Sequence, residues 1–217
     1  MKRIIVICEG ETEREFCKHV LAPHLMHFEI FLQAPLIKKS MGGGVRWNIL
    51  KKEIETHLQE SDVIVSTLID YYGLYQKYNF PKWLEGEKII NKVSRMDFLE
   101  SAMQMDVSEE TRYRFIPYLQ LHEFEGLLFN DIQIFYDQVP KNELVGIAEL
   151  KKTFAEYENP EMINNNRETS PSHRLKRIIK GYNKPLYGHY FAEAIGIESL
   201  RRKSPRFNQW IERLINY

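Results

Sequence analysis

Three predominantly apolar runs stand out along the chain. They lie at residues 4–8, 62–70 and 113–121, and all three are rich in Ile, Val, Leu and aromatic residues. Runs of this length without polar alternation are typical of strands buried on both faces, as in a parallel sheet. Pro117 lies inside the third run and cannot donate to a strand ladder, so it indicates an edge position or a bulge.

Between these runs, apolar residues recur at helical spacing. Thr12, with Glu15 three residues later, has the pattern of a capping box that opens the first helix. A second strand is expected at 34–39, followed by a glycine-rich loop at 41–44 that is a weak candidate for a phosphate cradle. The expected helices cover residues 12–28, with Pro23 ending or kinking the segment, residues 47–58, and residues 80–105, broken around Glu85 and Gly86.

The alternation of strand and helix stops near residue 130. Helices are expected over 142–157, from Ser170 to Lys180, over 191–197 and over 207–215, separated by a polar loop at 159–169, a turn at 181–185 and a basic loop at 201–206. The sequence therefore predicts an α/β domain at 1–130, with a short parallel sheet flanked by helices, and a helical, basic C-terminal extension at 131–217 packed on it.

Charge is divided unevenly along the 217 residues. Residues 1–165 hold 19 Lys and Arg against 26 Asp and Glu, a net −7, and residues 166–217 hold 11 against 4, a net +7. This suggests an acidic site beside a basic surface, as a metal-using enzyme acting on a polyanion needs, although solvated faces can produce the same pattern.

The two cysteines, the short apolar runs and the absence of one nucleotide-binding motif narrow the class of protein. Cys8 and Cys17 have no partners at metal-ligand spacing, so both are interpreted as reduced core residues of a cytoplasmic protein. No apolar run approaches the ~18–20 residues that span a bilayer, which predicts a soluble chain without membrane partners. The sequence contains no G-x-x-x-x-G-K-[ST] motif, so a P-loop ATPase is excluded.

Carboxylates follow each apolar run. Glu9 and Glu13 follow the first run, Asp70 ends the second, and Glu123 and Glu125 follow the third. Because the carboxyl ends of parallel strands meet at one edge of a sheet, these acids should converge there, and oxygen ligands without a cysteine cluster indicate Mg²⁺ or Mn²⁺. Complementing a helix dipole is the alternative role for Glu13. If a helix begins at residue 122, only one of Glu123 and Glu125 can face the crevice, whereas an extended start would place both on one face. Glu123 is favoured.

Several stretches resemble one protein family. Cys-Glu-Gly-Glu-Thr-Glu at 8–13, Ile-Asp-Tyr-Tyr-Gly at 69–73 and His-Glu-Phe-Glu-Gly-Leu-Leu-Phe at 122–129 resemble an uncharacterised bacterial family with a Toprim-like (topoisomerase-primase) domain. C-terminal stretches at 160–164, 170–175, 182–184 and 206–210 resemble the same family. The resemblance implies a Mg²⁺-dependent fold that acts on nucleic-acid phosphodiesters. Glu9 matches the early Toprim glutamate and Asp70 the first acid of the Asp-x-Asp pair, whose second acid is replaced by Tyr72.

A nuclease of this kind would give individual residues distinct roles. Glu9 would be the general base or acid and also a candidate metal ligand, and Asp70 would be the principal metal ligand, with Glu13, Glu123 and Glu125 completing the metal shell. His122 would donate to the scissile phosphate, with a structural role as its alternative. Three basic residues of the extension, Arg174, Arg177 and Lys184, would contact phosphates, with a solvated helix face as the alternative.

Three functions remain open from the sequence. The first is a Mg²⁺- or Mn²⁺-dependent nuclease, an effector of bacterial defence against phage that works with a separately encoded ATPase. The second is a non-catalytic Toprim-like scaffold that binds such an ATPase or nucleic acid, with Tyr72 marking the lost acid. The third is a receiver-like or phosphatase-like domain in which Asp70 takes a phosphoryl group, which would require a lysine at a further strand end, and no strand is expected after residue 130.

Overall fold

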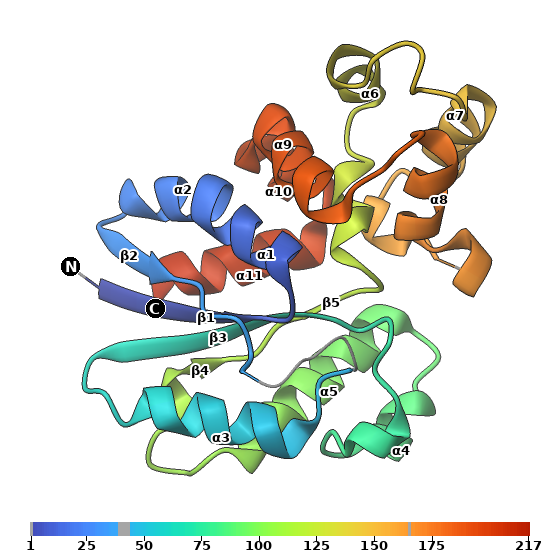
Figure 1. Ribbon diagram of the computed structural model, residues 1–217. Coiled ribbons are helices and arrows are strands. Elements are labelled where there is room, and N and C mark those ends of the chain that lie inside the picture. Colours follow the sequence, from blue (N-terminus) through green and yellow to red (C-terminus); the bar gives the residue numbers. More distant parts are fainter. Residues whose placement is uncertain (1, 39–43, 165) are drawn as a thin grey trace.

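A five-stranded parallel sheet lies at the centre of the computed structural model, which describes residues 2–38, 44–164 and 166–217 (Figure 1). Its order is β2-β1-β3-β4, and β5 continues beside the end of β3. The strands are β1 (Lys2–Cys8), β2 (Ile30–Gln33), β3 (Val63–Asp70), β4 (Phe115–Ile116) and β5 (Leu119–Gln120), and every pairing is parallel. The expected α/β fold with a short parallel sheet flanked by helices is confirmed.

Helices cover both faces of the sheet. In chain order they are α1 (Glu11–Phe16), a π-helical turn η1 (Cys17–Leu21), α2 (Ala22–Met26), α3 (Trp47–Leu58), α4 (Trp83–Glu87), α5 (Lys92–Asp106), α6 (Ile132–Gln138), α7 (Ile147–Glu156), α8 (Pro171–Ile178), α9 (Lys184–Ile195), α10 (Ile197–Lys203) and α11 (Pro205–Asn216). Short 3₁₀ turns are η2 (Gln76–Tyr78), η3 (Arg112–Arg114), η4 (Phe124–Leu128), η5 (Pro160–Met162) and η6 (Arg167–Thr169). One core joins the sheet to α1, α2, α9 and α11, and a second joins its other face to α3, α4 and α5 (Figure 1).

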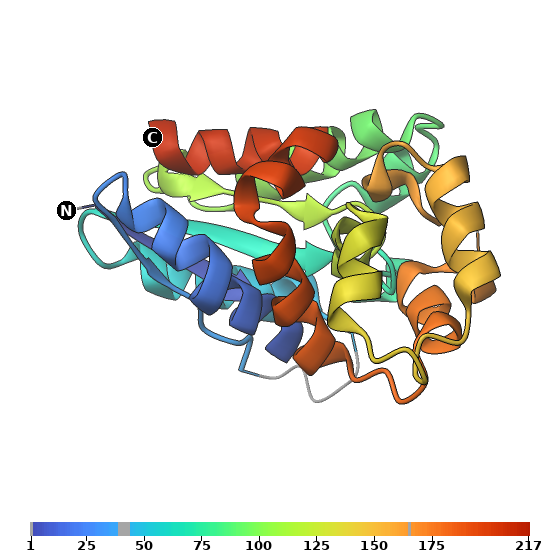
Figure 2. The same ribbon diagram turned by 90° about the horizontal axis from the view of Figure 1, so that it is seen from above.

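The carboxyl end of the sheet is the end on which the later helices gather. Figure 2 shows α6, α7 and α8 at this end, opposite the two termini. The termini themselves meet, because Nζ of Lys2 donates to the backbone oxygen of Tyr217 at 3.1 Å. The last helix, α11, lies on the sheet, where Nε1 of Trp210 donates to Oγ of Ser66 at 2.9 Å. The basic extension thus supplies part of the sheet's own core.

The third expected strand is interrupted where Pro117 predicts it. Phe115–Ile116 and Leu119–Gln120 each pair with β3, and the gap between them is bridged by a side chain. Oγ1 of Thr67 donates to the oxygen of Tyr118 at 2.9 Å and accepts from its nitrogen at 3.0 Å. Since Pro117 has no N–H to donate, the threonine replaces the missing ladder bonds.

Two expectations near the N-terminus are wrong. The second strand lies at Ile30–Gln33. Of the expected 34–39, the structure describes residues 34–38, where Leu36 forms an isolated bridge with Cys8, because Pro35 lacks the N–H that a continuing ladder needs. The first helix is not capped by Thr12 and Glu15. Its N-cap is Gly10, whose nitrogen donates to Oε2 of Glu13 at 2.9 Å. The glycine-rich loop at 41–44 lies, apart from Gly44, outside the described residues.

Two helices of the extension begin elsewhere than expected. α7 starts at Ile147 rather than residue 142, because Leu144 forms an antiparallel bridge with Ile179. α9 starts at Lys184 rather than residue 191, because Oδ1 of Asn183 accepts from the nitrogen of Leu186 at 3.1 Å and caps the helix. Residues 201–203, expected in a loop, are the last turn of α10.

No helix among the described residues is long and apolar enough to cross a bilayer. Cys8 and Cys17 are both buried free thiols, with their sulfur atoms 3.8 Å apart. They are core residues, as the sequence predicts.

Candidate functional site

Glu9 and Asp70 meet where β1 and β3 end. Oε2 of Glu9 accepts from the backbone nitrogen of Asp70 at 3.1 Å, and the nitrogen of Glu9 donates to the oxygen of Leu68 at 3.2 Å. Asp70 is 7% exposed, and its Oδ1 accepts from the nitrogen of Phe124 at 2.8 Å. The parallel register of β1 and β3 therefore brings together two acids that are 61 residues apart in sequence.

Glu13 joins this pair from the first turn of α1. Its side chain is buried and accepts a hydrogen bond from the nitrogen of Gly10. Its carboxylate also lies in the first turn of α1, where it complements the helix dipole. Its charge also acts on the other acids, since it contributes to the raised pKa values of Glu9, Asp70 and Glu125. Glu13 therefore belongs to the acidic cluster and also stabilises the helix start.

Glu123 and Glu125 point to different partners. Both oxygens of Glu123 are engaged by Ser172 at the start of α8, through its nitrogen at 2.8 Å and its hydroxyl at 2.9 Å. Glu125, in η4, has an exposed fraction of 0% and lies 3.0 Å from Nζ of Lys184. The structure reverses the expected preference for Glu123, because His122 has a φ of 66° and turns the chain before the 3₁₀ turn begins.

Lys184, the first residue of α9, places its ammonium group among these acids. Its Nζ lies 3.0 Å from Oε1 of Glu125 and 3.8 Å from Oδ2 of Asp70. Although burial lowers the pKa of Lys184, the charges of Glu125 and Asp70 raise it well above its usual value, so the group stays protonated. The sequence predicts Lys184 as a phosphate contact, and the structure places it inside the acidic cluster.

One ammonium group does not balance this cluster. Burial, followed by the charge of Glu13, raises the pKa of Glu9 from 4.5 to about 7. Burial also raises the pKa of Glu125 to about 7, against the opposing effect of Lys184, and it raises the pKa of Asp70. Carboxylates this close favour either protons or additional positive charge. We call Glu9, Glu13, Asp70, Glu125 and Lys184 the acidic cluster.

Two buried polar groups beside Lys184 lack hydrogen bonds. Oε2 of Glu125 and the hydroxyl of Tyr182 are inaccessible to solvent and have no hydrogen-bond partner within the described ranges. Burial, followed by the charge of Glu125, raises the pKa of Tyr182, so its hydroxyl stays protonated near pH 7. Tyr182 is a site residue that the sequence analysis does not identify as a candidate, although residues 182–184 belong to the family resemblance. Buried polar groups without partners are typical of places where a bound ion or water completes the site.

The carboxylate oxygens of the acidic cluster suit a hard cation, but in the described residues they are not already arranged around a cation-binding position. Carboxylate oxygens are the ligands that Mg²⁺ and Mn²⁺ prefer. Among residues 2–38, 44–164 and 166–217, however, no three His, Cys, Asp or Glu side chains are already arranged to hold a metal ion. Lys184 occupies the position between Asp70 and Glu125, so a cation would bind these acids by displacing the ammonium group.

His122 is held by a cation rather than by the acids. Its Nε2 lies 3.0 Å from Nζ of Lys92, which also donates to the oxygen of Asn164 at 3.1 Å. Burial, with the charges of Lys92 and Arg95, lowers the pKa of His122 to about 3. The imidazole is therefore neutral near pH 7, and Nε2 accepts a hydrogen bond. A neutral imidazole in this state is not a source of a proton for a leaving group.

The two candidate arginines of α8 lie among internal partners. Arg174 is buried, and its guanidinium donates to the oxygen of Thr169 at 2.8 Å and to Oγ1 of Thr153 at 3.0 Å. Arg177 is exposed and pairs with Glu149, with its Nε 3.0 Å from Oε2. Both arginines thus have protein partners outside the acidic cluster.

Comparison with known proteins gives a family and little else. A family model described as "Domain of unknown function (DUF4276)" matches residues 8–215. UDP-N-acetylmuramoylalanine--D-glutamate ligases from three serotypes of Streptococcus agalactiae are 28% identical over 89 residues, which covers 39% of this chain and 19% of each ligase. The chain therefore matches about a fifth of the length of these curated relatives. No solved structure matches it significantly. Because the family model spans nearly the whole sequence, the chain belongs to the DUF4276 family.

Proposed function

We propose that this protein is a Mg²⁺- or Mn²⁺-dependent hydrolase of nucleic-acid phosphodiester bonds. The observation that carries the proposal is the acidic cluster, in which four carboxylates from the ends of β1 and β3, from α1 and from η4 surround a single ammonium group. The resemblance of 8–13 and 69–73 to Toprim-like motifs supports it independently, because Glu9 and Asp70 are the matching acids.

Asp70, Glu125, Glu9 and Glu13 would hold the cation. Glu123, whose charge contributes to the raised pKa of Glu125, would form the outer ring of acids. A bound divalent cation would supply polarisation of a phosphoryl oxygen and an acidic water.

The chain's own groups have complementary tasks in this proposal. Glu9, at the end of β1, would take a proton from the attacking water and later return it to the leaving oxygen. The ammonium group of Lys184, once released from Asp70 and Glu125, would neutralise phosphate charge. Neutral His122 would accept rather than donate, orienting Lys92 near the substrate, in place of the proton donor expected from the sequence.

Partners and compartment follow from the same proposal. A nucleic acid is the polyanion that the net +7 of residues 166–217 favours, with exposed Lys176 and Lys180 as additional contacts beside Arg177. A separately encoded ATPase would bind and hydrolyse ATP, because this sequence has no P-loop. We further propose a cytoplasmic location and a role in defence against phage, and the two buried free thiols are compatible with a reducing compartment.

A non-catalytic scaffold is the second candidate. It is favoured by Tyr72 at the position of the second Toprim acid and by Lys184, which already neutralises part of the cluster. In this alternative, Lys184 takes the place of a metal permanently and the fold serves only to bind a partner.

Cleavage assays separate the two candidates. Purified protein is incubated with plasmid, single-stranded DNA and tRNA in Mg²⁺, in Mn²⁺ and in EDTA. The proposal expects metal-dependent cleavage that falls by about 100-fold or more in Asp70→Asn and Glu125→Gln, whereas Glu110→Gln, at an exposed position, keeps wild-type activity. The scaffold would be favoured if the wild type cleaves none of the substrates, or if Asp70→Asn and Glu125→Gln cleave them as fast as the wild type does.

A further inference from the structure

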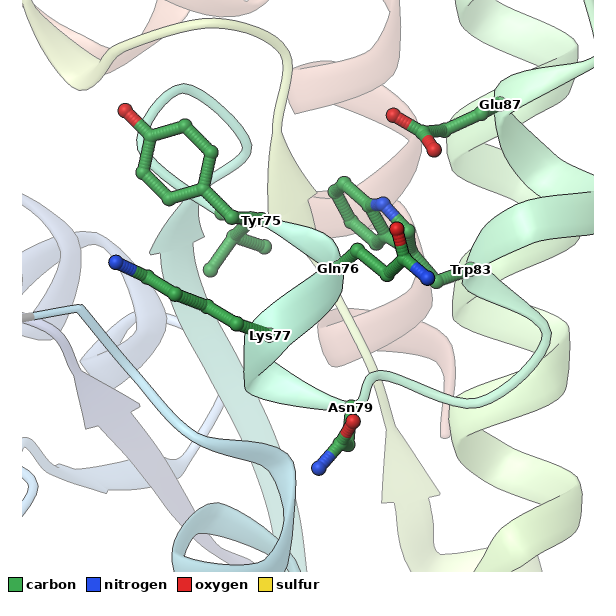
Figure 3. Close-up of a pocket in the computed structure, with 7 residues that line it drawn as sticks. Tyr75, Gln76, Lys77, Asn79, Trp83 and Glu87 are labelled. Atoms are coloured by element: carbon green, nitrogen blue, oxygen red, sulfur yellow. The ribbon is translucent and has the colours of Figure 1, made fainter.

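A hollow opens beside the end of β3. It is a cavity of about 700 Å³ lined by residues of the segment 74–87, and Figure 3 shows the side chains that form its wall. These are Tyr75, Gln76, Lys77, Asn79, Trp83 and Glu87. None of them belongs to the acidic cluster, and the proposed function gives them no task.

The cavity and the acidic cluster share one edge of the sheet. Leu74, in the cavity wall, follows Asp70 by four residues, so their Cα atoms are at most about 14 Å apart. The intervening turn is fixed to the neighbouring strand, because the nitrogens of Tyr71 and Tyr72 donate to the oxygens of Gln120 and His122 at 2.9 and 2.8 Å. A short polymer bound at the cluster can therefore extend over the cavity.

Tyr75 offers an aromatic surface at the rim. Its side chain is 55% exposed, so its ring is open to solvent. Nζ of Lys77 lies 5.5 Å from the centre of the Tyr75 ring and 5.3 Å from that of Tyr78. An exposed ring beside a lysine is the combination that binds a nucleobase by stacking and its phosphate by charge.

Trp83 contributes a donor to the inner wall. Its ring packs against Tyr71 and Phe80, with centroids 5.6 and 6.3 Å apart, so its orientation is fixed. Its Nε1 is buried and has no hydrogen-bond partner within the part of the chain that the structure describes. In Figure 3 the side chains of Gln76 and Trp83 overlap in the view, and both line the cavity.

The remaining lining groups are suited to the edge of a base. Gln76 and Asn79 carry amides that can both donate and accept, and Glu87 carries a carboxylate that accepts from N–H groups of a base edge. Asn79 has a φ of 57° and ends the 3₁₀ turn, which holds the rim in place. Together these side chains combine a flat ring with several hydrogen-bonding groups and one ammonium.

We propose that this cavity binds one nucleobase of a single-stranded nucleic acid whose backbone continues to the acidic cluster. The inference deepens the proposed function and rests on it for the class of substrate. Stacking on Tyr75 would hold the base, Lys77 would contact the adjoining phosphate, and the polar wall would receive the base edge. The site would favour unpaired strands, since a base inside a duplex cannot present its face to a ring.

Binding is tested without metal, so that no cleavage is involved. A labelled oligothymidylate and an abasic oligomer of equal length are titrated with protein in EDTA and followed by fluorescence anisotropy. The wild type should bind the oligothymidylate about 5- to 150-fold more tightly than the abasic oligomer, the range that stacking of one base supplies. Tyr75→Ala should abolish this difference, and Tyr113→Ala should retain it, because Tyr113 is 62% exposed but precedes β4 at the opposite edge of the sheet.

Each outcome bears on the inference. Equal affinity of the wild type for both oligomers, or an unchanged preference in Tyr75→Ala, would overturn it. If the protein binds thymidine monophosphate but does not prefer the oligothymidylate to the abasic oligomer, the cavity binds free nucleotides. That result would overturn the proposal that it binds a base of a nucleic-acid strand. Base-dependent binding by a protein that cleaves nothing would support the cavity and reject the proposed hydrolysis, whereas metal-dependent cleavage with base-independent binding would do the reverse.

Discussion

Replacing Lys184 by Met nearly preserves the side-chain volume and removes the ammonium group from the acidic cluster. That group lies 3.0 Å from Glu125 and 3.8 Å from Asp70. Removing one partner of a buried ion pair costs about 3–5 kcal/mol, because the other charge remains without compensation. Since the Lys184 side chain is 40% exposed and water screens it, we expect the lower end of this range, about 3 kcal/mol.

The cost of Lys184→Met depends on pH. In the unfolded chain Glu125 ionises near its ordinary pKa of 4.5, and in the folded protein it ionises at about 7. The folded state therefore binds more protons between these values, and its stability falls as the pH rises through them. Without the ammonium group the folded pKa rises further. The variant should accordingly match the wild type near pH 5, where Glu125 is protonated in both proteins. Its loss should reach about 1.4 kcal/mol at pH 8, one pH unit above the wild-type pKa of about 7, and approach about 3 kcal/mol near pH 9.

Urea denaturation followed by circular dichroism, in EDTA at both pH values, measures this difference. Lys180→Met is the matched control, because Lys180 is exposed and precedes α9 in the same segment. It should change the free energy of unfolding by less than about 0.5 kcal/mol. The reasoning is refuted if Lys184→Met is as stable as this control near pH 8, or if its loss of stability is the same at both pH values.

Three further predictions concern the packing around the site. Glu100→Ala should cost about 3–5 kcal/mol in urea denaturation, because Arg206, 5% exposed and 2.6 Å away, loses its buried partner; a loss under about 1 kcal/mol would contradict this. Gly188→Ala should cost about 1–3 kcal/mol and lower the Tm, because the new Cβ would lie 2.4 Å from Cγ2 of Thr12; an unchanged Tm would show that the two helices separate freely. His122, with a pKa of about 3, should show no titration of its imidazole resonances between pH 5 and 8, and a midpoint near neutrality would disprove its pairing.

The parts of the site that follow strands were predictable from sequence. Glu9 and Asp70 come directly after continuous apolar runs, and the chirality of parallel crossovers places the ends of such runs at one edge. Pro117 likewise marks the interruption of the third strand, because the missing N–H is a property of the residue itself. In each case the signal is local, and tertiary contacts only complete it.

The parts that depend on unusual backbone geometry or on distant packing were not predictable. The positive φ of His122 decides whether Glu123 or Glu125 joins the acidic cluster, and the spacing of apolar residues in a sequence cannot predict a positive φ. The place of Lys184 depends on where α9 begins and on the close approach of Gly188 to α1, 170 residues and more away in sequence. A basic helix pattern could not reveal that Arg174 is buried, because its partners lie on other segments.

Calorimetric titration of Mn²⁺ into the protein tests for a cation site at the acidic cluster without any substrate. We expect saturable binding to the wild type and to Asp137→Ala, whose carboxylate is exposed on α6, and loss of binding in Asp70→Ala. Folding of each variant is checked by circular dichroism. No binding to the folded wild type, or equal binding to folded Asp70→Ala, would contradict a cation site at the acidic cluster.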